Sequence, residues 1–201
     1  MFFVQTFPLK QAVAVVLTTL LLGACGSSPE PVVPRDVAFA VTEALSVDAT
    51  SVDVQFMNVP PREYPHVGHR SPVTFEDASR KWIGTRFHLT GNAAIALRII
   101  FKKGDITEEL LPVKTGIAGT FKKEQAGKYE ARLEVALELV DPNGKVLASA
   151  SGEAWNTHTV PEDATENDKR IVWVGMVAQA FDSLDQELTP RIHQGMGEYI
   201  R

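Results

Sequence analysis

Cysteine is almost absent from this chain, which has a single one, Cys25, among its 201 residues. One cysteine cannot close a disulfide within the chain, so a disulfide framework is excluded. Cys25 directly follows an apolar run and precedes a segment rich in proline and serine. No core is expected there to bury it as a small apolar side chain. The position of Cys25 therefore calls for a chemical role.

An excess of basic residues is also lacking, since 20 Lys and Arg stand against 25 Asp and Glu, a net charge of −5. Residues 1–24 hold one basic residue, Lys10, and no acid, so the rest carries 19 basic and 25 acidic side chains, net −6. Nucleic-acid binding needs a basic face that neutralises phosphates. We therefore expect no nucleic-acid partner.

Motifs for catalysis are missing as well. The sequence has no G-x-S-x-G, Ser-x-x-Lys, H-E-x-x-H, P-loop or G-x-G-x-x-G pattern. The carboxylates on the predicted strands alternate with apolar residues, which is typical of a solvated face, although a pair of acids could still meet in the fold. We predict that the protein is not an enzyme and has no catalytic residues, with an envelope hydrolase as a third hypothesis.

Two histidines, His66 and His69, are three residues apart in a predicted loop. A metal site would need further ligands at suitable spacing, and the remaining histidines, at 88, 158 and 193, are scattered singly. We therefore interpret His66 and His69 as exposed loop residues and predict neither a metal site nor a cofactor.

The longest apolar run, residues 12–22, is too short to span a bilayer, which takes about 20 residues. A cationic start at Lys10, a short apolar run and the small residues Gly23 and Ala24 are typical of a secretory signal peptide. We expect export, with residues 1–24 as the signal peptide.

The stretch Leu22-Gly23-Ala24-Cys25 resembles the lipobox of bacterial lipoproteins. The resemblance implies that the peptide is cut before Cys25 and that the cysteine carries acyl chains, which would anchor the protein stably in a membrane. Asp after the cysteine is that family's inner-membrane retention signal. Gly26 stands there instead, which implies the periplasmic face of the outer membrane, with the inner membrane as the alternative.

A tether and one domain follow the anchor. Residues 25–36 contain Pro29, Pro31 and Pro34, which favour an extended chain of about 3.1 Å per residue. We assign residues 37–201 to a single periplasmic domain, since a domain commonly takes roughly 100–200 residues.

Apolar periodicity predicts the elements of the first half of the domain. Alternation predicts a short edge strand at residues 37–41 and a strand with one buried face at residues 52–56, followed by a loop to Pro72. Thr74 and Asp77 form a capping box that begins a helix ending at Gly84 or Gly91, with Trp82 on its core face. A central strand follows over residues 95–101. We expect it to continue past a glycine bulge at residues 102–105 rather than turn there.

The second half has the clearest pattern, a hairpin. Residues 129–139 alternate strictly, residues 141–144 form a turn, and the return strand carries small side chains from Ala148 to Ala154 at one parity. A bulge at Gly144 leaves open which parity faces inward. Apolar residues from Ile171 to Leu188 predict an amphipathic helix, and Pro190 predicts its end, with a second short helix after it. Residues 114–125 are predicted to be a loop.

This element order predicts an α+β fold, in which an antiparallel or mixed sheet of about four to five strands carries two main helices packed on one face. Together with the lipobox, the order resembles small periplasmic lipoproteins such as LPS-assembly lipoproteins and the auxiliary lipoproteins of lipid-transporting ABC systems. The resemblance implies a non-enzymatic accessory in lipid or LPS transport or in outer-membrane complex assembly. Its partners would be the membrane, through the acyl chains on Cys25, and an envelope protein or lipid. The alternative is a structural or cell-wall-associated lipoprotein without cargo.

Overall fold

The computed structural model describes residues 31–40, 43–91, 94–112 and 125–201. Residues 33–201 form one compact unit. Within the described residues no helix is both long enough and apolar enough to cross a membrane. The predicted loop at residues 114–125 lies outside the described residues except for Gln125.

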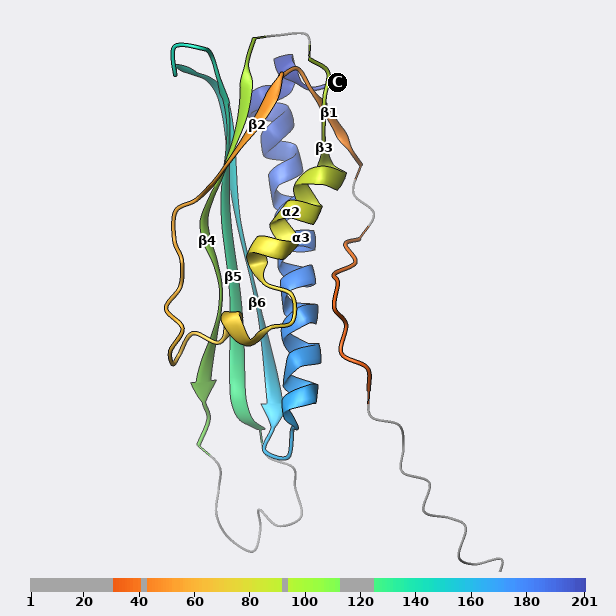
Figure 1. Ribbon diagram of the computed structural model, residues 1–201, viewed down its shortest axis with the longest axis vertical. Helices are drawn as coiled ribbons and strands as arrows, with labels where there is room; N and C mark the ends of the chain where they lie inside the picture. The colour runs from red at the N-terminus through yellow and green to blue at the C-terminus, as the bar shows by residue number, and fades with distance from the viewer. Residues whose placement is uncertain (1–30, 41–42, 92–93, 113–124) are drawn as a thin grey trace, which may run out of the picture. The chain divides into compact units, whose positions relative to one another are not determined.

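The main sheet has four strands in the order β2, β4, β5, β6 (Figure 1), namely β2 Ser51–Phe56, β4 Ala96–Leu110, β5 Gln125–Val140 and β6 Val146–Pro161. Strand β2 runs parallel to β4, whereas the β4–β5 and β5–β6 pairs are antiparallel. A second, small sheet pairs β1 (Leu45–Val47) with β3 (Phe87–Leu89) in parallel. The main sheet is therefore mixed, with one parallel and two antiparallel strand pairs.

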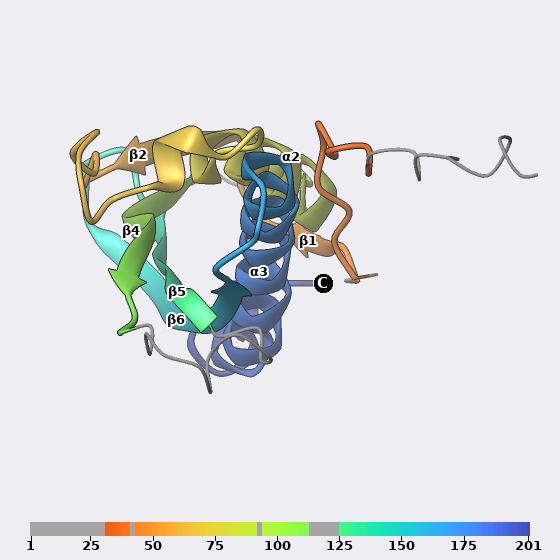
Figure 2. The same cartoon turned by 90° about the horizontal axis from the view of Figure 1, so that it is seen from below.

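Two helices, α2 (Phe75–Arg86) and α3 (Glu166–Met196), accompany the sheet, with short 3-10 turns at η1 (Gly68–Arg70) and η3 (Gly197–Tyr199). Viewed along its length, the main sheet curves, and both helices lie on its inner side (Figure 2). The predicted α+β class is thus confirmed.

Strand β4 is central, between β2 and β5, as its apolar pattern predicts. It continues without a turn to Leu110, with a register shift between Phe101 and Lys103, so the expected bulged continuation is confirmed.

The predicted hairpin forms between β5 and β6. Every second residue of β5 points inward and is almost completely buried: Tyr129, Ala131, Leu133, Val135, Leu137 and Leu139. In the turn, the Asp141 carboxylate accepts hydrogen bonds from the backbone N–H groups of Asn143 and Lys145 at 2.8 and 2.9 Å. The pairing register of the hairpin shifts beside the turn, between Leu139 and Val140. The face of β6 that carries Ala150 and Ala154 is buried, whereas the face that carries Trp155 is exposed.

The small side chains of β6 let α3 approach closely. A Cβ added at Gly152 would lie 3.3 Å from Leu184 Cδ1 of α3. Near the end of the helix, a Cβ added at Gly195 would lie 2.3 Å from the carbonyl oxygen of Ser149 in β6. No side chain fits at that distance, so Gly195 marks a direct contact between α3 and the sheet backbone.

Helix α3 does not end at Pro190, so the predicted break and second helix were wrong. It runs unbroken from Glu166 to Met196 with Pro190 inside it. A proline inside a helix costs about 3 kcal/mol because one hydrogen bond is lost. Leu188, Ile192 and Met196 are nevertheless all buried. Burying such side chains yields about 1.5–3 kcal/mol each, which offsets the cost of the proline.

Helix α2 begins at the predicted capping box, in which the Asp77 N–H donates to the Thr74 side chain and the Thr74 N–H donates to the Asp77 side chain. Its predicted end was wrong, because it passes Gly84 and stops at Arg86. The chain becomes extended at Phe87, whose ring packs edge-on against Trp82 with ring centroids 5.3 Å apart, and β3 pairs with β1 from there. Tertiary packing, rather than glycine, ends this helix.

Two predictions for the first strands were also wrong. Residues 37–40 form no strand, although Val37 is buried and Phe39 packs on Phe181 of α3, with ring centroids 5.4 Å apart; Val41 lies outside the described residues. Strand β2 forms as expected, but its apolar face is not buried, since Val54 and Phe56 are 39% and 37% exposed. Strand β2 is at the edge of the sheet, and a groove separates the end of the strand, at Phe56, from α2.

We call residues 36–40 the strap, because they cross α2 and α3 without secondary structure. The Lys81 ammonium of α2 donates to Asp36 Oδ2 at 2.5 Å and to the Val37 carbonyl at 2.6 Å. The Ala40 N–H donates to Asp182 Oδ1 of α3 at 2.7 Å. The bond from Lys81 lowers the pKa of the Asp36 carboxyl. These contacts hold the end of the predicted tether on the helical layer.

The contact at Gly195 leads to a stability prediction. Gly195→Ala should lower the free energy of unfolding by about 1–3 kcal/mol, because the new methyl group collides with the Ser149 carbonyl. Gly175→Ala on the same helix is the matched control, since a Cβ there meets nothing within 4 Å. It should raise stability by about 0.5–1 kcal/mol. Urea unfolding of both variants measures the difference, and equal effects would show that α3 does not touch β6 as described.

Candidate functional site

The predicted lipidation site lies outside the described residues. Leu22, Gly23, Ala24 and Cys25 all precede residue 31, as does the first half of the 25–36 tether. The lipobox therefore stays a prediction from sequence.

The most distinct surface feature arises where the edge of β4 has no neighbouring strand. Residues 51–56 of β2 pair with residues 96–101 of β4. Farther along, Val67 N donates to the Ile106 carbonyl and Glu108 N donates to the Pro65 carbonyl, both at 2.8 Å. The chain leaves the sheet between these pairings, as expected for the Pro60-Pro61 dipeptide, which cannot donate to a ladder. The edge of β4 at residues 102–105 is thus left without a paired strand.

A groove of about 170 Å³ opens there. We call it the edge groove. It is lined by residues of β2, β4, α2 and the loop between β2 and α2: Phe56, Asn58, Val59, Pro60, Pro61, Arg62, Gly68, His69, Thr74, Phe75, Glu76, Ser79, Phe101, Gly104 and Asp105.

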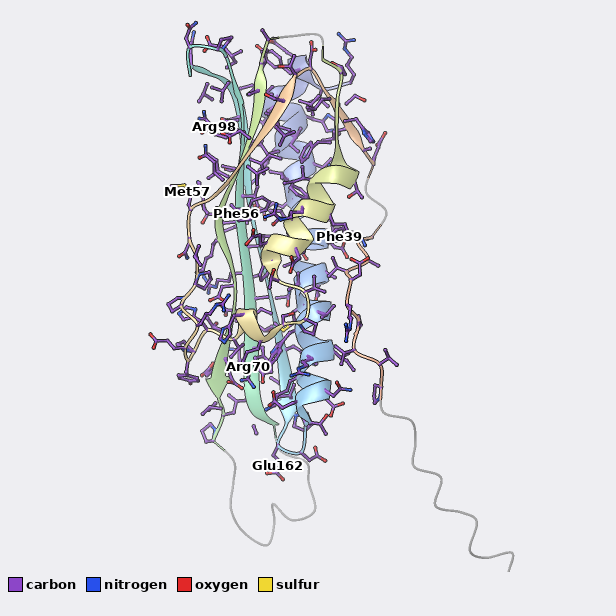
Figure 3. The ribbon with its side chains drawn as sticks, in the orientation of Figure 1. Phe39, Phe56, Met57, Arg70, Arg98 and Glu162 are labelled. Atoms are coloured by element: carbon purple, nitrogen blue, oxygen red, sulfur yellow. The ribbon has the colours of Figure 1, made fainter. Side chains whose placement is uncertain are left out.

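The walls of the edge groove are aromatic and aliphatic. Phe56 stacks on Phe101 with ring centroids 5.0 Å apart and an interplanar angle of 14°. Beside it, Met57 and Val59 are 67% and 83% exposed, and Met57 points outward from the end of β2 (Figure 3). Large apolar side chains that gather on one exposed surface are typical of a binding site.

Positive charge at the rim of the edge groove is uncompensated. Among the described residues, neither the Arg62 nor the His69 side chain has a hydrogen bond or an ion pair. The acids that line the groove are already engaged. Glu76 accepts from Arg80 Nη2 at 2.5 Å, and Asp105 Oδ1 accepts from its neighbour, the Ile106 N–H, at 2.8 Å. The rim therefore offers one cation and one ionisable imidazole to an anionic group.

His66 departs from the prediction that both loop histidines are exposed. His69 is exposed, but His66 is half-buried, and its Nδ1 bonds the carboxylate of the buried Asp105. This pair holds the loop against β4 beside the edge groove. The described residues contain no group of three or more His, Cys, Asp or Glu side chains placed to bind a metal ion. The two residues are 39 positions apart, so no local pattern announces the pair.

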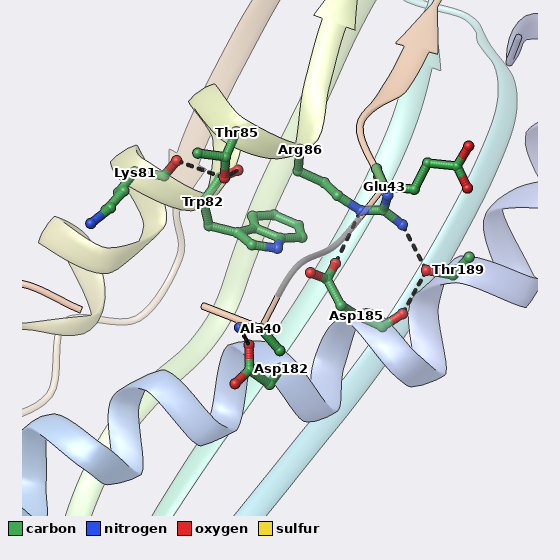
Figure 4. Close-up of polar contacts among 9 residues, drawn as sticks. All are labelled: Ala40, Glu43, Lys81, Trp82, Thr85, Arg86, Asp182, Asp185 and Thr189. Atoms are coloured by element: carbon green, nitrogen blue, oxygen red, sulfur yellow. Dashed lines mark hydrogen bonds and ion pairs between the residues drawn. The ribbon is translucent and has the colours of Figure 1, made fainter. Parts of the chain in front are cut away.

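A second polar cluster lies deep between α2 and α3 (Figure 4). Arg86, which is 1% exposed, donates from Nε to Asp185 Oδ1 at 3.1 Å and from Nη2 to Thr189 Oγ1 at 2.6 Å. Its Nη1 donates to the Glu43 carbonyl. Burial lowers the pKa of Arg86, and the Asp185 carboxylate opposes that shift. All three guanidinium nitrogens are engaged, so this cluster joins three segments rather than offering a reactive group.

The buried pair predicts a large effect on stability. Arg86→Met should lower the free energy of unfolding by about 3–5 kcal/mol, because the buried Asp185 carboxylate would lose its ion pair with the Arg86 guanidinium. Arg80→Met is the control. Arg80 is in α2 like Arg86, but its ion pair with Glu76 lies within that helix and is exposed, so its loss should cost less than about 1 kcal/mol. Urea unfolding compares the two, and similar losses would contradict the buried clamp.

Comparison with known proteins assigns no family. No family model matches the chain, and no curated protein matches it. Solved structures with similar folds include a minor lipoprotein from Acinetobacter baumannii, which is 13% identical over 75% of this chain and 93% of that chain, with a TM-score of 0.38. Rare lipoprotein B from Shewanella oneidensis is 13% identical over 68% of this chain and 91% of that chain, with a TM-score of 0.34.

A third similar structure is a homolog of a neuraminyllactose-binding hemagglutinin from Helicobacter pylori. It is 12% identical over 75% of this chain and 86% of that chain, with a TM-score of 0.39. Two of these three proteins are thus named lipoproteins. All three TM-scores lie below 0.5, so the likeness assigns no function to this chain.

Proposed function

We propose that this chain is a lipid-anchored protein of the bacterial envelope that binds an anionic amphiphile in the edge groove. In this role it is a non-enzymatic accessory in lipid or LPS transport or in the assembly of an outer-membrane complex. The single observation that carries the proposal is the edge groove itself, in which the exposed apolar side chains of Phe56 and Val59 lie beside the unpaired Arg62.

The chemistry of the edge groove fits a lipid better than a soluble metabolite. Apolar walls gain about 25 cal/mol for each Å² of apolar surface removed from water, which favours an acyl chain. An arginine at the rim binds phosphate or carboxylate with charge-assisted hydrogen bonds. The rest of the surface is acidic on balance, with a net charge of −6 after residue 24, so Arg62 and His69 would direct an anionic headgroup to this point.

The anchor supports the same role. A protein held by acyl chains on Cys25 stays at the membrane surface, where its cargo is concentrated. The tether of residues 25–36 would let the domain reach a partner or cargo near that surface. We place the protein at the periplasmic face of the outer membrane because Gly26, not Asp, follows the cysteine. Its protein partner would be another component of the envelope.

The anchor is tested by Cys25→Ala. The variant should be left unacylated and either uncleaved or mislocalised, because the acylated residue is lost. Membrane fractionation and intact mass measure the outcome. A conservative variant in the tether, Ser28→Ala, should behave as the wild type. Unchanged mass and fractionation in Cys25→Ala would refute lipid anchoring.

Cargo binding is tested by Phe56→Asp, which places a carboxylate in the edge groove. Lipid that co-purifies with the full chain in a crosslinked envelope pulldown, identified by mass spectrometry, should fall by about tenfold or more, because a charge would have to be desolvated. Trp155→Asp is the control, since Trp155 is 63% exposed on β6 and does not line the groove. Thermal unfolding checks that both variants fold.

Two results would contradict the cargo role. One is equal lipid in Phe56→Asp and Trp155→Asp, and the other is a wild-type pulldown that returns only random neighbours and no lipid. Retention of the wild-type chain on isolated sacculi without bound lipid would instead favour the structural, cell-wall-associated alternative.

A further inference from the structure

A second cavity, of about 270 Å³, lies beneath the strap, between α2 and α3. We call it the strap cavity. Phe39 and Ala40 of the strap form one wall, Thr85 and the Lys81 side chain of α2 form the mouth, and Trp82, Arg86 and Asp185 form the floor. Ala40 and Thr85 are exposed, whereas the three floor residues are buried. The strap cavity is therefore an open pocket with a buried floor, and it shares no residue with the edge groove.

The floor carries a hydrogen-bond donor without an acceptor. Trp82 is 1% exposed, and its indole Nε1 has no partner among the described residues. In Figure 4 the indole nitrogen is directed toward the side on which Ala40 and Asp185 lie. A buried N–H group without a partner is destabilising, and native proteins nearly always satisfy such groups. The donor therefore points to an acceptor that the described residues do not supply.

Charge around the strap cavity restricts what that acceptor can be. Two cations, Lys81 and Arg86, stand against three carboxylates, Asp36, Asp182 and Asp185. Both cations already hold carboxylate partners, so an anionic ligand would meet net negative charge. A cationic group without a lone pair could not accept from the indole N–H. The remaining class is a neutral molecule with an oxygen acceptor.

We propose that the strap cavity binds a neutral aliphatic molecule that carries a single hydroxyl or ester oxygen, which accepts a hydrogen bond from Trp82 Nε1. The aliphatic part lies along the Phe39 ring and the Thr85 methyl group. An apolar cavity of about 150 Å³ suffices to hold benzene, so the strap cavity has room for a chain of at least six carbons. This site is independent of the edge groove and does not rest on the function proposed for it.

The test follows the indole N–H signals of the full chain labelled with ¹⁵N, using 1-hexanol as the probe. The chain has three tryptophans, so three indole signals are expected. Trp155→Phe identifies the exposed one, and nuclear Overhauser contacts with Phe39 identify that of Trp82. Hexanol should move the Trp82 indole proton downfield and saturably, because a new hydrogen bond forms, and should leave the Trp155 signal in place.

Matched variants separate the strap cavity from unspecific binding. Ala40→Leu fills the mouth and should weaken hexanol binding by about tenfold or more. Ala38→Leu, on the same strap but outside the cavity lining, should leave it unchanged. Thr85→Leu provides a second filling variant should Ala40→Leu fail to fold. Hexanoate, the anion of the same chain length, should not move the Trp82 signal.

Three results would overturn the proposal. The first is a Trp82 indole signal that does not respond to hexanol. The second is a Trp82 signal that responds to hexanol equally in Ala40→Leu and Ala38→Leu, or that responds to hexanoate as strongly as to hexanol. The third is a water molecule that contacts the Trp82 indole proton and that hexanol does not displace, which would show that the floor donor binds water only.

Discussion

The close contact between α3 and the small side chains of β6 is the constraint on which the other positions depend. Gly152 and Gly195 bring the helix onto the sheet backbone. A neighbouring side of α3 carries Phe181, Asp185 and Thr189, which hold the strap and α2 in place. The position of α2 in turn fixes one wall of the edge groove and the floor of the strap cavity. The shapes of the edge groove and of the strap cavity therefore both depend on the contact between α3 and β6.

Features set by local chemistry could be predicted from the sequence. Strict alternation in β5, the turn at Gly144 and the capping box at Thr74 each involve residues close in the chain, and all three are present in the structure. A second capping box, in which Thr165 and Asp168 begin α3, has the same signature and was missed. That residue pattern was available in the sequence.

Features that depend on distant residues could not be predicted in the same way. Proline propensity predicts an end to α3 at Pro190, but the burial of Leu188 and Ile192 on the sheet outweighs it. The pairs His66–Asp105 and Arg86–Asp185 join residues 39 and 99 positions apart. The end of β2 before Pro60-Pro61 was predicted, but the return of the same loop to β4, where Val67 bonds Ile106 and Pro65 bonds Glu108, joins distant residues and leaves no local pattern.

The two cavities differ in charge, and this difference separates their ligands. The edge groove has an unpaired cation at Arg62, whereas the strap cavity is surrounded by more carboxylates than cations. One fold would thus select an anionic amphiphile at the open sheet edge and a neutral aliphatic molecule beside the end of the tether. The most direct test of the central claim is a crystal structure of the chain with short-chain phosphatidylglycerol. We predict an acyl chain against Phe56 and Phe75 with the phosphate bound by Arg62, and lipid bound elsewhere with an empty edge groove would contradict lipid binding at this site.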